Sequence, residues 1–177
     1  RCLRDGVKTV VRTDPDAIEE FNKLHDATAR RHRFHRFSAD YIAKEFSVFA
    51  PNYAFVVSVY LTDGRLDSAA IVIAYGSTGA YRHGASLGLD QRLPTSYAVQ
   101  WQAIREVKKR GMDMYNFWGI APDGSKPSHP FYGITHFKKG FGGSGKQLVS
   151  CQDLPLAGSY WLTYLFEKMR KMYRGFY

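Results

Sequence analysis

The sequence contains few cysteines and no long apolar run. Its two cysteines, Cys2 and Cys151, lie far apart and have no metal-ligand spacing. This usage excludes a disulfide framework and favours a reducing compartment. No run of about 18 apolar residues occurs, so no transmembrane helix is predicted. The histidines are dispersed, and His32 and His35 lack an acidic or cysteine neighbour, so we expect no metal site.

Acidic residues are also scarce relative to basic ones. The chain has 25 Lys and Arg against 16 Asp and Glu, which gives a formal charge of +9. Such a balance favours a polyanionic partner, namely nucleic acid, nucleotide phosphates or an anionic membrane surface. A soluble surface with excess lysine is the alternative. A hydrophobic content of 45% over 177 residues predicts one globular domain rather than disorder.

The chain begins at Arg1 without a signal-peptide pattern or an initiator methionine, which suggests a piece of a longer protein. Apolar periodicity and turn residues predict its secondary structure. Strands are expected at 6–12, 54–61, 68–75, 80–85, 114–118 and 147–154, and helices at 15–30, from Ser38 to just before Pro51, at 96–110 and at 159–173. Asp14, Ser38 and either Thr95 or Ser96 are the expected N-caps.

The segment from Tyr115 to Ile120 is the centre of the predicted organisation. Its apolar and aromatic residues predict a buried strand. A loop rich in Pro, Gly and Ser follows at residues 121–130. The cluster Phe137-Lys138-Lys139-Gly140-Phe141-Gly142-Gly143 comes after this loop. Strands that end in polar, glycine-rich loops often carry the chemistry of α/β proteins. The glycines would let a ligand approach the backbone closely.

The element order is β-α-α-β-β-β-α-β-loop-β-α, which predicts an α/β fold with a mixed central sheet flanked by helices. This order resembles the GNAT (acyl-CoA N-acyltransferase) fold. By that analogy, the strands at 80–85 and 114–118 flank the cleft. The apolar pattern of the last helix predicts that it buries one face.

The connection from Leu87 to Ser96 bears on the acyl donor. GNAT enzymes that use acetyl-CoA hold its pyrophosphate with a basic, glycine-rich loop and a helix N-terminus. Here the last positions lack two closely spaced glycines, and Pro94 removes one N–H donor. The sequence therefore favours another donor.

An ordered set of motifs resembles the second GNAT-like domain of the Fem (FemABX) peptidyltransferases, which use aminoacyl-tRNA to build the interpeptide bridge of bacterial peptidoglycan. The matching segments are Thr28 to Phe34, Arg36 to Tyr41, Ala80 to Ser86, Pro94 with Gln100 to Ile104, Tyr115 to Ile120 and Phe137 to Gly143. Trp118 departs from the pattern, which often has Gly at that place. The resemblance implies that residues 1–177 form one GNAT-like domain, the second of a longer two-domain protein, whose activity in isolation is open.

The resemblance also implies roles for individual residues. Lys138 would stabilise the oxyanion that forms when an amine attacks the aminoacyl ester, and Phe137 would pack beside the 3′-adenine or the acyl group. Lys139 is the less favoured cation.

Residues elsewhere in the motifs would bind the acceptor. Arg36 and Tyr41 would hold a phosphate of a UDP- or lipid-linked muramoyl pentapeptide, because the guanidinium fork suits phosphate, and Tyr81 would hydrogen-bond the acceptor. Asp113 and Asp123 are unranked candidates for proton acceptor.

The expected function is thus aminoacyl transfer from tRNA to the amino group of a peptidoglycan precursor. We expect no cofactor beyond that co-substrate, a cytoplasmic location in bacteria and peripheral contact with the inner membrane face. Two alternatives stay open: a GNAT N-acyltransferase that uses acyl-CoA, and a non-catalytic half that binds tRNA or muropeptide.

Overall fold

The computed structural model describes residue 2 and residues 4–173. The chain divides after Trp118 into two compact units. The first unit contains a five-stranded sheet and three helices, and the second contains two helices.

The sheet has the order β1-β2-β3-β4-β5. Its strands are β1 (Lys8–Arg12), β2 (Ala54–Tyr60), β3 (Leu66–Tyr75), β4 (Thr78–Ser86) and β5 (Met114–Asn116). The first four pair as an antiparallel meander, and β5 pairs in parallel with β4 after a helical crossover. The predicted mixed sheet is therefore confirmed.

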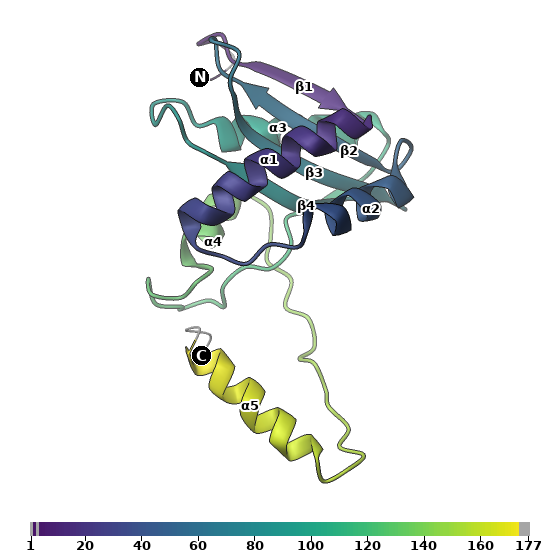
Figure 1. Cartoon of the computed structure of the whole chain (residues 1–177), viewed down its shortest axis with the longest axis vertical. Helices are drawn as coiled ribbons and strands as arrows, with labels where there is room; N and C mark the ends of the chain where they lie inside the picture. Colours follow the sequence, from purple (N-terminus) through teal and green to yellow (C-terminus); the bar gives the residue numbers. More distant parts are fainter. Residues whose placement is uncertain (1, 3, 174–177) are drawn as a thin grey trace. The chain divides into compact units, whose positions relative to one another are not determined.

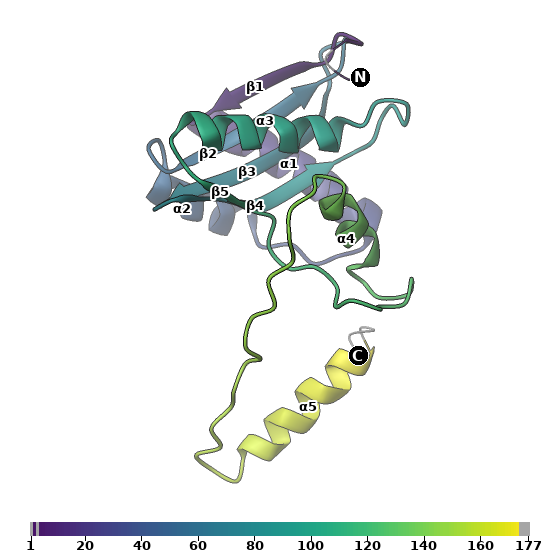
Figure 2. The same ribbon diagram turned by 180° about the vertical axis from the view of Figure 1, so that it is seen from behind.

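Helices cover both faces of this sheet. Helices α1 (Pro15–His32) and α2 (Ala39–Phe49) lie on one face (Figure 1), and α3 (Thr95–Lys109) lies on the other (Figure 2). The core under α1 and α2 includes Phe21, Ile42 and Ile71. The core under α3 includes Phe55 and Val107. Burial of these apolar side chains provides most of the driving force for this layered packing.

Two of the three predicted helix caps are confirmed. The Asp14 carboxylate accepts a hydrogen bond from the Ala17 N–H at 3.1 Å, and the Ser38 hydroxyl accepts one from the Tyr41 N–H at 3.1 Å. The prediction for α3 is wrong, because Pro94 is the N-cap and makes no side-chain cap. The hydroxyl of Thr95 instead donates to the buried carboxylate of Asp67.

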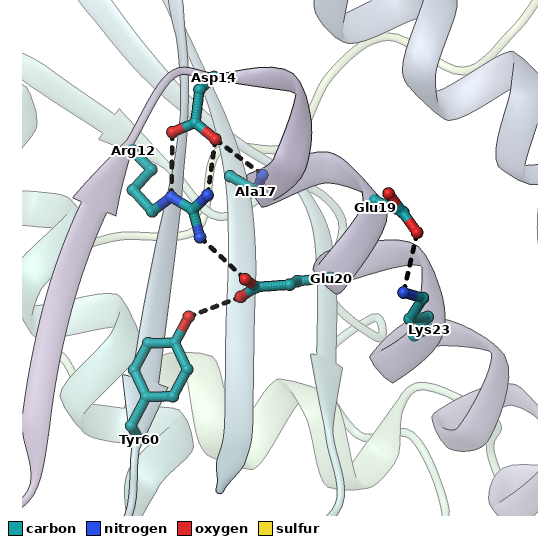
Figure 3. Close-up of polar contacts among 7 residues, drawn as sticks. All are labelled: Arg12, Asp14, Ala17, Glu19, Glu20, Lys23 and Tyr60. Atoms are coloured by element: carbon teal, nitrogen blue, oxygen red, sulfur yellow. Dashed lines mark hydrogen bonds and ion pairs between the residues drawn. The ribbon is translucent and has the colours of Figure 1, made fainter. Parts of the chain in front are cut away.

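A network of charged groups joins β1, α1 and β2 (Figure 3). Arg12 donates to Asp14 at 2.6 Å and to Glu20 at 3.0 Å, and the Tyr60 hydroxyl donates to Glu20 at 2.6 Å. The hydrogen bond from Arg12 lowers the pKa of Asp14 to about 2. The hydrogen bond from Tyr60 contributes most to holding the pKa of Glu20 below its ordinary value.

Strand β5 is shorter and more exposed than predicted. It ends at Asn116, and both Met114 and Asn116 are exposed. The Asn116 side chain accepts a hydrogen bond from the Trp118 N–H at 2.7 Å, and Trp118 has a left-handed φ of 62°. This local turn takes the backbone out of the extended conformation.

The second unit contains α4 (Tyr132–Lys139) and α5 (Tyr160–Tyr173). Part of the predicted glycine-rich cluster is thus helical. The strand expected at 147–154 is wrong, since these residues join no ladder. The buried face expected for α5 is also wrong, since no α5 residue is buried. An amphipathic pattern indicates which face would be buried, but it does not provide a packing partner.

Candidate active site

The β4–β5 ladder is short and leaves one edge of β4 open. Pairing joins Thr78–Ala80 to Met114–Asn116 and stops there, whereas β4 continues to Ser86. Within the described part of the chain, residues 81–86 therefore have no strand partner on the β5 side. An open strand edge exposes backbone donors and acceptors that an extended ligand can use.

A β-bulge lies on this open part of β4. Ile71 pairs with His83 and Val72 pairs with Tyr81, so Arg82 is the extra residue. A bulge re-aims side chains and often occurs next to active sites. Here Arg82 and His83, although consecutive, both contact the same carboxylate on α2.

That carboxylate belongs to Glu45. Its Oε1 accepts from Arg82 at 2.7 and 2.9 Å, and its Oε2 lies 2.7 Å from His83 Nε2. Burial acts to raise the pKa of Glu45, but the hydrogen bonds from Arg82 and His83 outweigh it and hold that pKa below its ordinary value. Burial lowers the pKa of His83 despite the opposing effect of Glu45. The trio keeps an ionised carboxylate bound beside the open strand edge.

Tyr81 points to the opposite face of the sheet, toward the core under α3. A Cβ placed on Gly84 would lie 1.6 Å from the Tyr81 hydroxyl oxygen, so the tyrosine ring fills the space beside that glycine. Burial raises the pKa of Tyr81 to about 12. Tyr115 lies in the same core, and its hydroxyl donates to Gln100 at 2.7 Å.

Arg36 is bound within the fold. Its guanidinium donates to Asp26 Oδ1 at 2.6 Å, to the Asn22 carbonyl at 2.9 Å, to the Asn22 side chain, and through Nε to the Phe37 carbonyl at 2.9 Å. Its side chain is 9% exposed. An acceptor phosphate at Arg36 would have to compete with these bonds.

Two exposed aromatic side chains, Tyr41 and Trp118, contact other residues of the first unit. The ring of Tyr41 stacks on Phe37 at 4.7 Å. The guanidinium of Arg82 lies over the Trp118 ring, 5.9 Å from its centroid. Trp118 is exposed, which differs from the core position favoured by the sequence.

His25 lies beneath this surface and is 6% exposed. Its ring is 6.2 Å from that of His83, and its Nδ1 has no hydrogen-bond partner in the described structure. Burial lowers the pKa of His25 to about 4, and the charge of Arg36 acts in the same direction. His25 is therefore a neutral side chain at pH 7.

Lys138 is the buried cation of the second unit. It is 7% exposed, and its Nζ donates to the Gly119 carbonyl at 2.7 Å. Burial lowers its pKa. No carboxylate pairs with it among the residues that the structure describes. A lysine in such surroundings can direct its charge toward a developing oxyanion, because little water screens it.

The neighbours of Lys138 on α4 differ from it in their surroundings. Lys139 is exposed and pairs with Asp123 at 3.1 Å. The half-buried Phe137 ring meets Phe141 edge-on at 5.5 Å. Asp123 is bound to Lys139, and both Asp113 and Asp123 are exposed, so neither lies in the buried surroundings typical of a catalytic base.

Thr135 links α4 to the start of the loop. Its hydroxyl accepts from the Ala121 N–H at 2.7 Å and donates to the Phe131 carbonyl at 2.6 Å. Thr135 and Lys138 are three residues apart on the buried face of α4, so both side chains fix the 119–121 backbone. Sequence reasoning missed Thr135, although a threonine at this spacing from the lysine is a usable signal once α4 is known to be helical.

The predicted site residues thus fall into two groups. Arg36, Tyr41 and Tyr81 belong to the first unit, while Phe137, Lys138 and Lys139 are consecutive on α4 in the second. Glu45 was missed as well, because only the fold brings α2 to the bulge. Within residues 2 and 4–173, no group of three His, Cys, Asp or Glu could hold a metal ion. No helix in that part of the chain is long and apolar enough to span a membrane.

Known proteins resemble this chain in both sequence and fold. FemA of Staphylococcus epidermidis, an aminoacyltransferase, is 37% identical over 71 residues, which are 40% of this chain and 15% of that protein. FemA of Staphylococcus aureus strain MW2 is 34% identical over 71 residues. The matched region is therefore a small part of these curated relatives.

Solved structures support the fold. The crystal structure of FemX superposes with a TM-score of 0.68 at 16% identity, over 78% of this chain and 50% of FemX. A ribosomal-protein-alanine N-acetyltransferase from Brucella melitensis gives a TM-score of 0.57 at 13% identity, over 85% of this chain and all of that protein. The predicted GNAT-like fold is confirmed. A sequence profile of the FemAB family matches residues 66–168, more than half of the chain, and the chain therefore belongs to the FemAB family.

Proposed function

We propose that this chain is the GNAT-like domain of an aminoacyltransferase that moves an amino acid from aminoacyl-tRNA to an amino group of a peptidoglycan precursor. The observation that carries this proposal is the buried Lys138 held against the Gly119 carbonyl. Its place within the segment that matches the FemAB family supports the assignment. The names of the FemA relatives support aminoacyl transfer as the class of reaction.

The reaction needs positioning and charge stabilisation rather than an enzyme nucleophile. The acceptor amine attacks the ester carbonyl carbon, a C–N bond forms, and the C–O bond to the ribose breaks. The proton lost by the amine ends on the released ribose hydroxyl. The carbonyl oxygen carries negative charge in the tetrahedral intermediate, and a fixed cation lowers the energy of that state. Lys138 provides this cation in the proposal.

Acyl-CoA is the second candidate donor, and the 87–95 connection counts against it. The buried Asp67 carboxylate accepts from the Leu89 N–H at 2.6 Å and from the Thr95 hydroxyl. Asp67 thus engages a backbone N–H of the connection that would be needed as a donor to a pyrophosphate, and its carboxylate disfavours a second anion nearby. Pro94 at the N-cap removes a further donor.

The partners in this proposal are aminoacyl-tRNA and a UDP- or lipid-linked muramoyl pentapeptide, with Arg36 and Tyr41 on the acceptor side. A hydrogen bond from Tyr81 to the acceptor would require its ring to leave the core under α3. The protein would act in the bacterial cytoplasm and contact the inner membrane face. No other cofactor takes part. The chain would form the second of two GNAT-like domains in the whole enzyme.

A transfer assay tests the proposal. The chain is mixed with charged tRNA and UDP-muramoyl pentapeptide, and mass spectrometry follows a one-residue increase on the peptide. We expect Lys138→Met to lower transfer by about 100- to 1,000-fold, as for loss of one oxyanion donor. Lys146→Met, which removes an exposed cation in the same unit, is the matched control.

Other outcomes separate the alternatives. Full transfer by Lys138→Met would contradict the catalytic assignment. Pentapeptide or tRNA binding without transfer in any variant would favour a non-catalytic half. Saturable binding of CoA would favour the hypothesis that acyl-CoA is the donor.

A further inference from the structure

The outer face of α3 has an aromatic and basic surface that the proposed reaction does not use. We define the α3 stripe as Trp101, Arg105, Lys108 and Lys109. Residues three and four apart lie on one side of a helix, and all four of these side chains are exposed. The opposite side of α3 buries Val99, Ala103 and Val107 against the sheet, so the stripe points away from the core. Figure 2 shows α3 lying across this face of the sheet.

Trp101 is the unusual member of the stripe. It is 55% exposed, and it makes no aromatic ring contact or hydrogen bond within the described part of the chain. More than half of this large aromatic surface therefore remains open to solvent, which the packing of the fold does not require. Exposed tryptophans of this kind are typical of binding surfaces, where the ring provides contact area at low conformational cost.

The cations of the stripe also have no ion-pair partner in the described part of the chain. Arg105, Lys108 and Lys109 form no ion pair among residues 2 and 4–173. The only acidic residue of α3 is Glu106, which pairs with Arg110 at 2.9 Å. Lysines in a last turn also interact favourably with the helix dipole, but the dipole explains neither Arg105 nor the tryptophan.

Aromatic and cationic side chains in this order match the chemistry of single-stranded RNA. Unpaired bases stack on aromatic rings, and the flanking phosphates bind Arg and Lys. Lys108 lies seven positions after Trp101, so these two residues are about 10 Å apart along the helix axis. The formal charge of +9 favours the same partner through long-range attraction.

We propose that the α3 stripe binds an unpaired segment of RNA, with Trp101 stacking on a base and Arg105, Lys108 and Lys109 contacting phosphates. This inference rests on the proposed function, in which an RNA carries the aminoacyl group. It adds a surface for that RNA which is distinct from the residues assigned to the reaction. A base-paired stem would bind less well, because its bases are not free to stack on the ring.

Fluorescence anisotropy tests the role of the tryptophan. The probes are a labelled single-stranded oligoribonucleotide, the corresponding RNA duplex and uncharged tRNA, each titrated with the 177-residue chain. We expect Trp101→Ala to weaken single-strand binding by about 5- to 100-fold, and Trp101→Phe to retain most of the affinity. Trp161→Ala, which removes another exposed tryptophan, is the control and should leave the affinity unchanged.

Salt dependence tests the cations. We expect the triple variant Arg105→Gln, Lys108→Gln, Lys109→Gln to reduce the slope of log affinity against log salt by about 2, since each lost phosphate contact removes roughly 0.7 for single strands. The control replaces Lys8, Lys23 and Lys44 with Gln, which removes the same charge from other elements. Equal slopes for the two triple variants would overturn the proposal, because they would show that only net charge matters.

A spectroscopic measurement does not depend on disruptive variants. With Trp118→Phe and Trp161→Phe, Trp101 is the one remaining tryptophan. Stacking predicts that single-stranded RNA quenches its fluorescence. No quenching at RNA concentrations that saturate the anisotropy signal would overturn the proposal. Trp101-dependent binding to anionic vesicles, with unchanged RNA affinity in Trp101→Ala, would also overturn it.

The failure of this inference can be told apart from the failure of the proposed function. RNA binding that depends on Trp101 supports the stripe even where no transfer occurs. Transfer that depends on Lys138 but is unaffected by Trp101→Ala, at RNA concentrations below saturation, overturns the stripe and leaves the function standing. Lys138→Met should lose transfer while it retains RNA affinity.

Discussion

The ammonium group of Lys138 donates a hydrogen bond to the carbonyl oxygen of Gly119, 2.7 Å away and 19 residues earlier in the chain. This bond joins α4 to the segment that directly follows Trp118. It positions the cation but neutralises none of its charge, because a carbonyl is only a dipole. Burial lowers the pKa of Lys138. This lowered pKa has a measurable consequence for the proposed reaction.

Transfer should decline at a lower pH than an ordinary lysine would predict. If cationic Lys138 stabilises the oxyanion, the rate falls as pH rises through its lowered pKa, because the neutral amine no longer provides charge. A pH–rate profile of the transfer assay checks this. Lys138→Arg retains a cation at every pH in range and should lack the alkaline decline, whatever its absolute rate. An identical alkaline decline in both proteins would assign it to another group.

Gly84→Ala should destabilise the first unit. The added Cβ would lie 1.6 Å from the Tyr81 hydroxyl oxygen and 2.5 Å from the ring carbon that bears it, so the ring must leave its place against the core under α3. We expect a loss of about 1–3 kcal/mol in the free energy of unfolding, as for other overpacked sites. Urea denaturation followed by circular dichroism measures this loss.

Gly133→Ala is the matched control for that substitution. Gly133 lies in α4, and a Cβ there meets nothing within 4 Å. Alanine is favoured over glycine in a helix by about 1 kcal/mol, so this variant should be neutral or slightly more stable. Equal destabilisation by both substitutions would show that Tyr81 does not determine the cost at Gly84.

Local signals in the sequence predicted much of the fold. Asp14 and Ser38 were identifiable as N-caps because an oxygen-bearing side chain directly precedes each apolar helical pattern. The strands predicted at 54–61 and 68–75 are confirmed as β2 and β3, which pair antiparallel. The failures lie where tertiary partners decide the outcome. Thr95 was an expected cap, but a buried carboxylate from β3 engages its hydroxyl.

The candidate site was less predictable than the fold. Lys138 lay in a recognisable motif, yet its burial depends on α4, a helix that was not predicted from the sequence. The β4 bulge has no signature in sequence, since Arg82 becomes the extra residue only through the pairing of β3 with β4. The role of Glu45 can be recognised only once that bulge is known. Its partners are 37 and 38 residues away, beyond any local pattern.

Glu45→Gln should destabilise the fold because it removes the charge that binds two partners. Arg82 and His83 have side chains 27% and 7% exposed, so water replaces the lost interaction poorly. We expect a loss of about 1.5–3 kcal/mol, as for hydrogen bonds to charged groups. Glu19→Gln, which breaks the exposed pair with Lys23, is the control and should have no measurable effect. Equal effects would show that the bulge does not depend on this carboxylate.

His25 should make the stability of the first unit fall in mild acid. Its pKa is about 4 in the folded protein, against an ordinary value of 6.5. The unfolded chain therefore binds more protons between these values, and stability falls as pH decreases from 6.5 to 4. The contribution of neutral His25 is fully present above pH 6.5, and its loss amounts to about 3 kcal/mol, at 1.36 kcal/mol per pKa unit.

Other groups titrate in the same range, so the test is a difference between two proteins. The pKa of Glu45 is lowered and that of His83 is also lowered, and both contribute acid sensitivity of their own. His25→Phe removes one titration while it retains a ring against Phe21 and Phe34. Urea midpoints measured from pH 7 to pH 4 should fall less steeply in this variant than in the parent. Parallel curves would show that the pKa of His25 is the same in the folded and the unfolded protein, and the unpartnered Nδ1 would then have no energetic consequence.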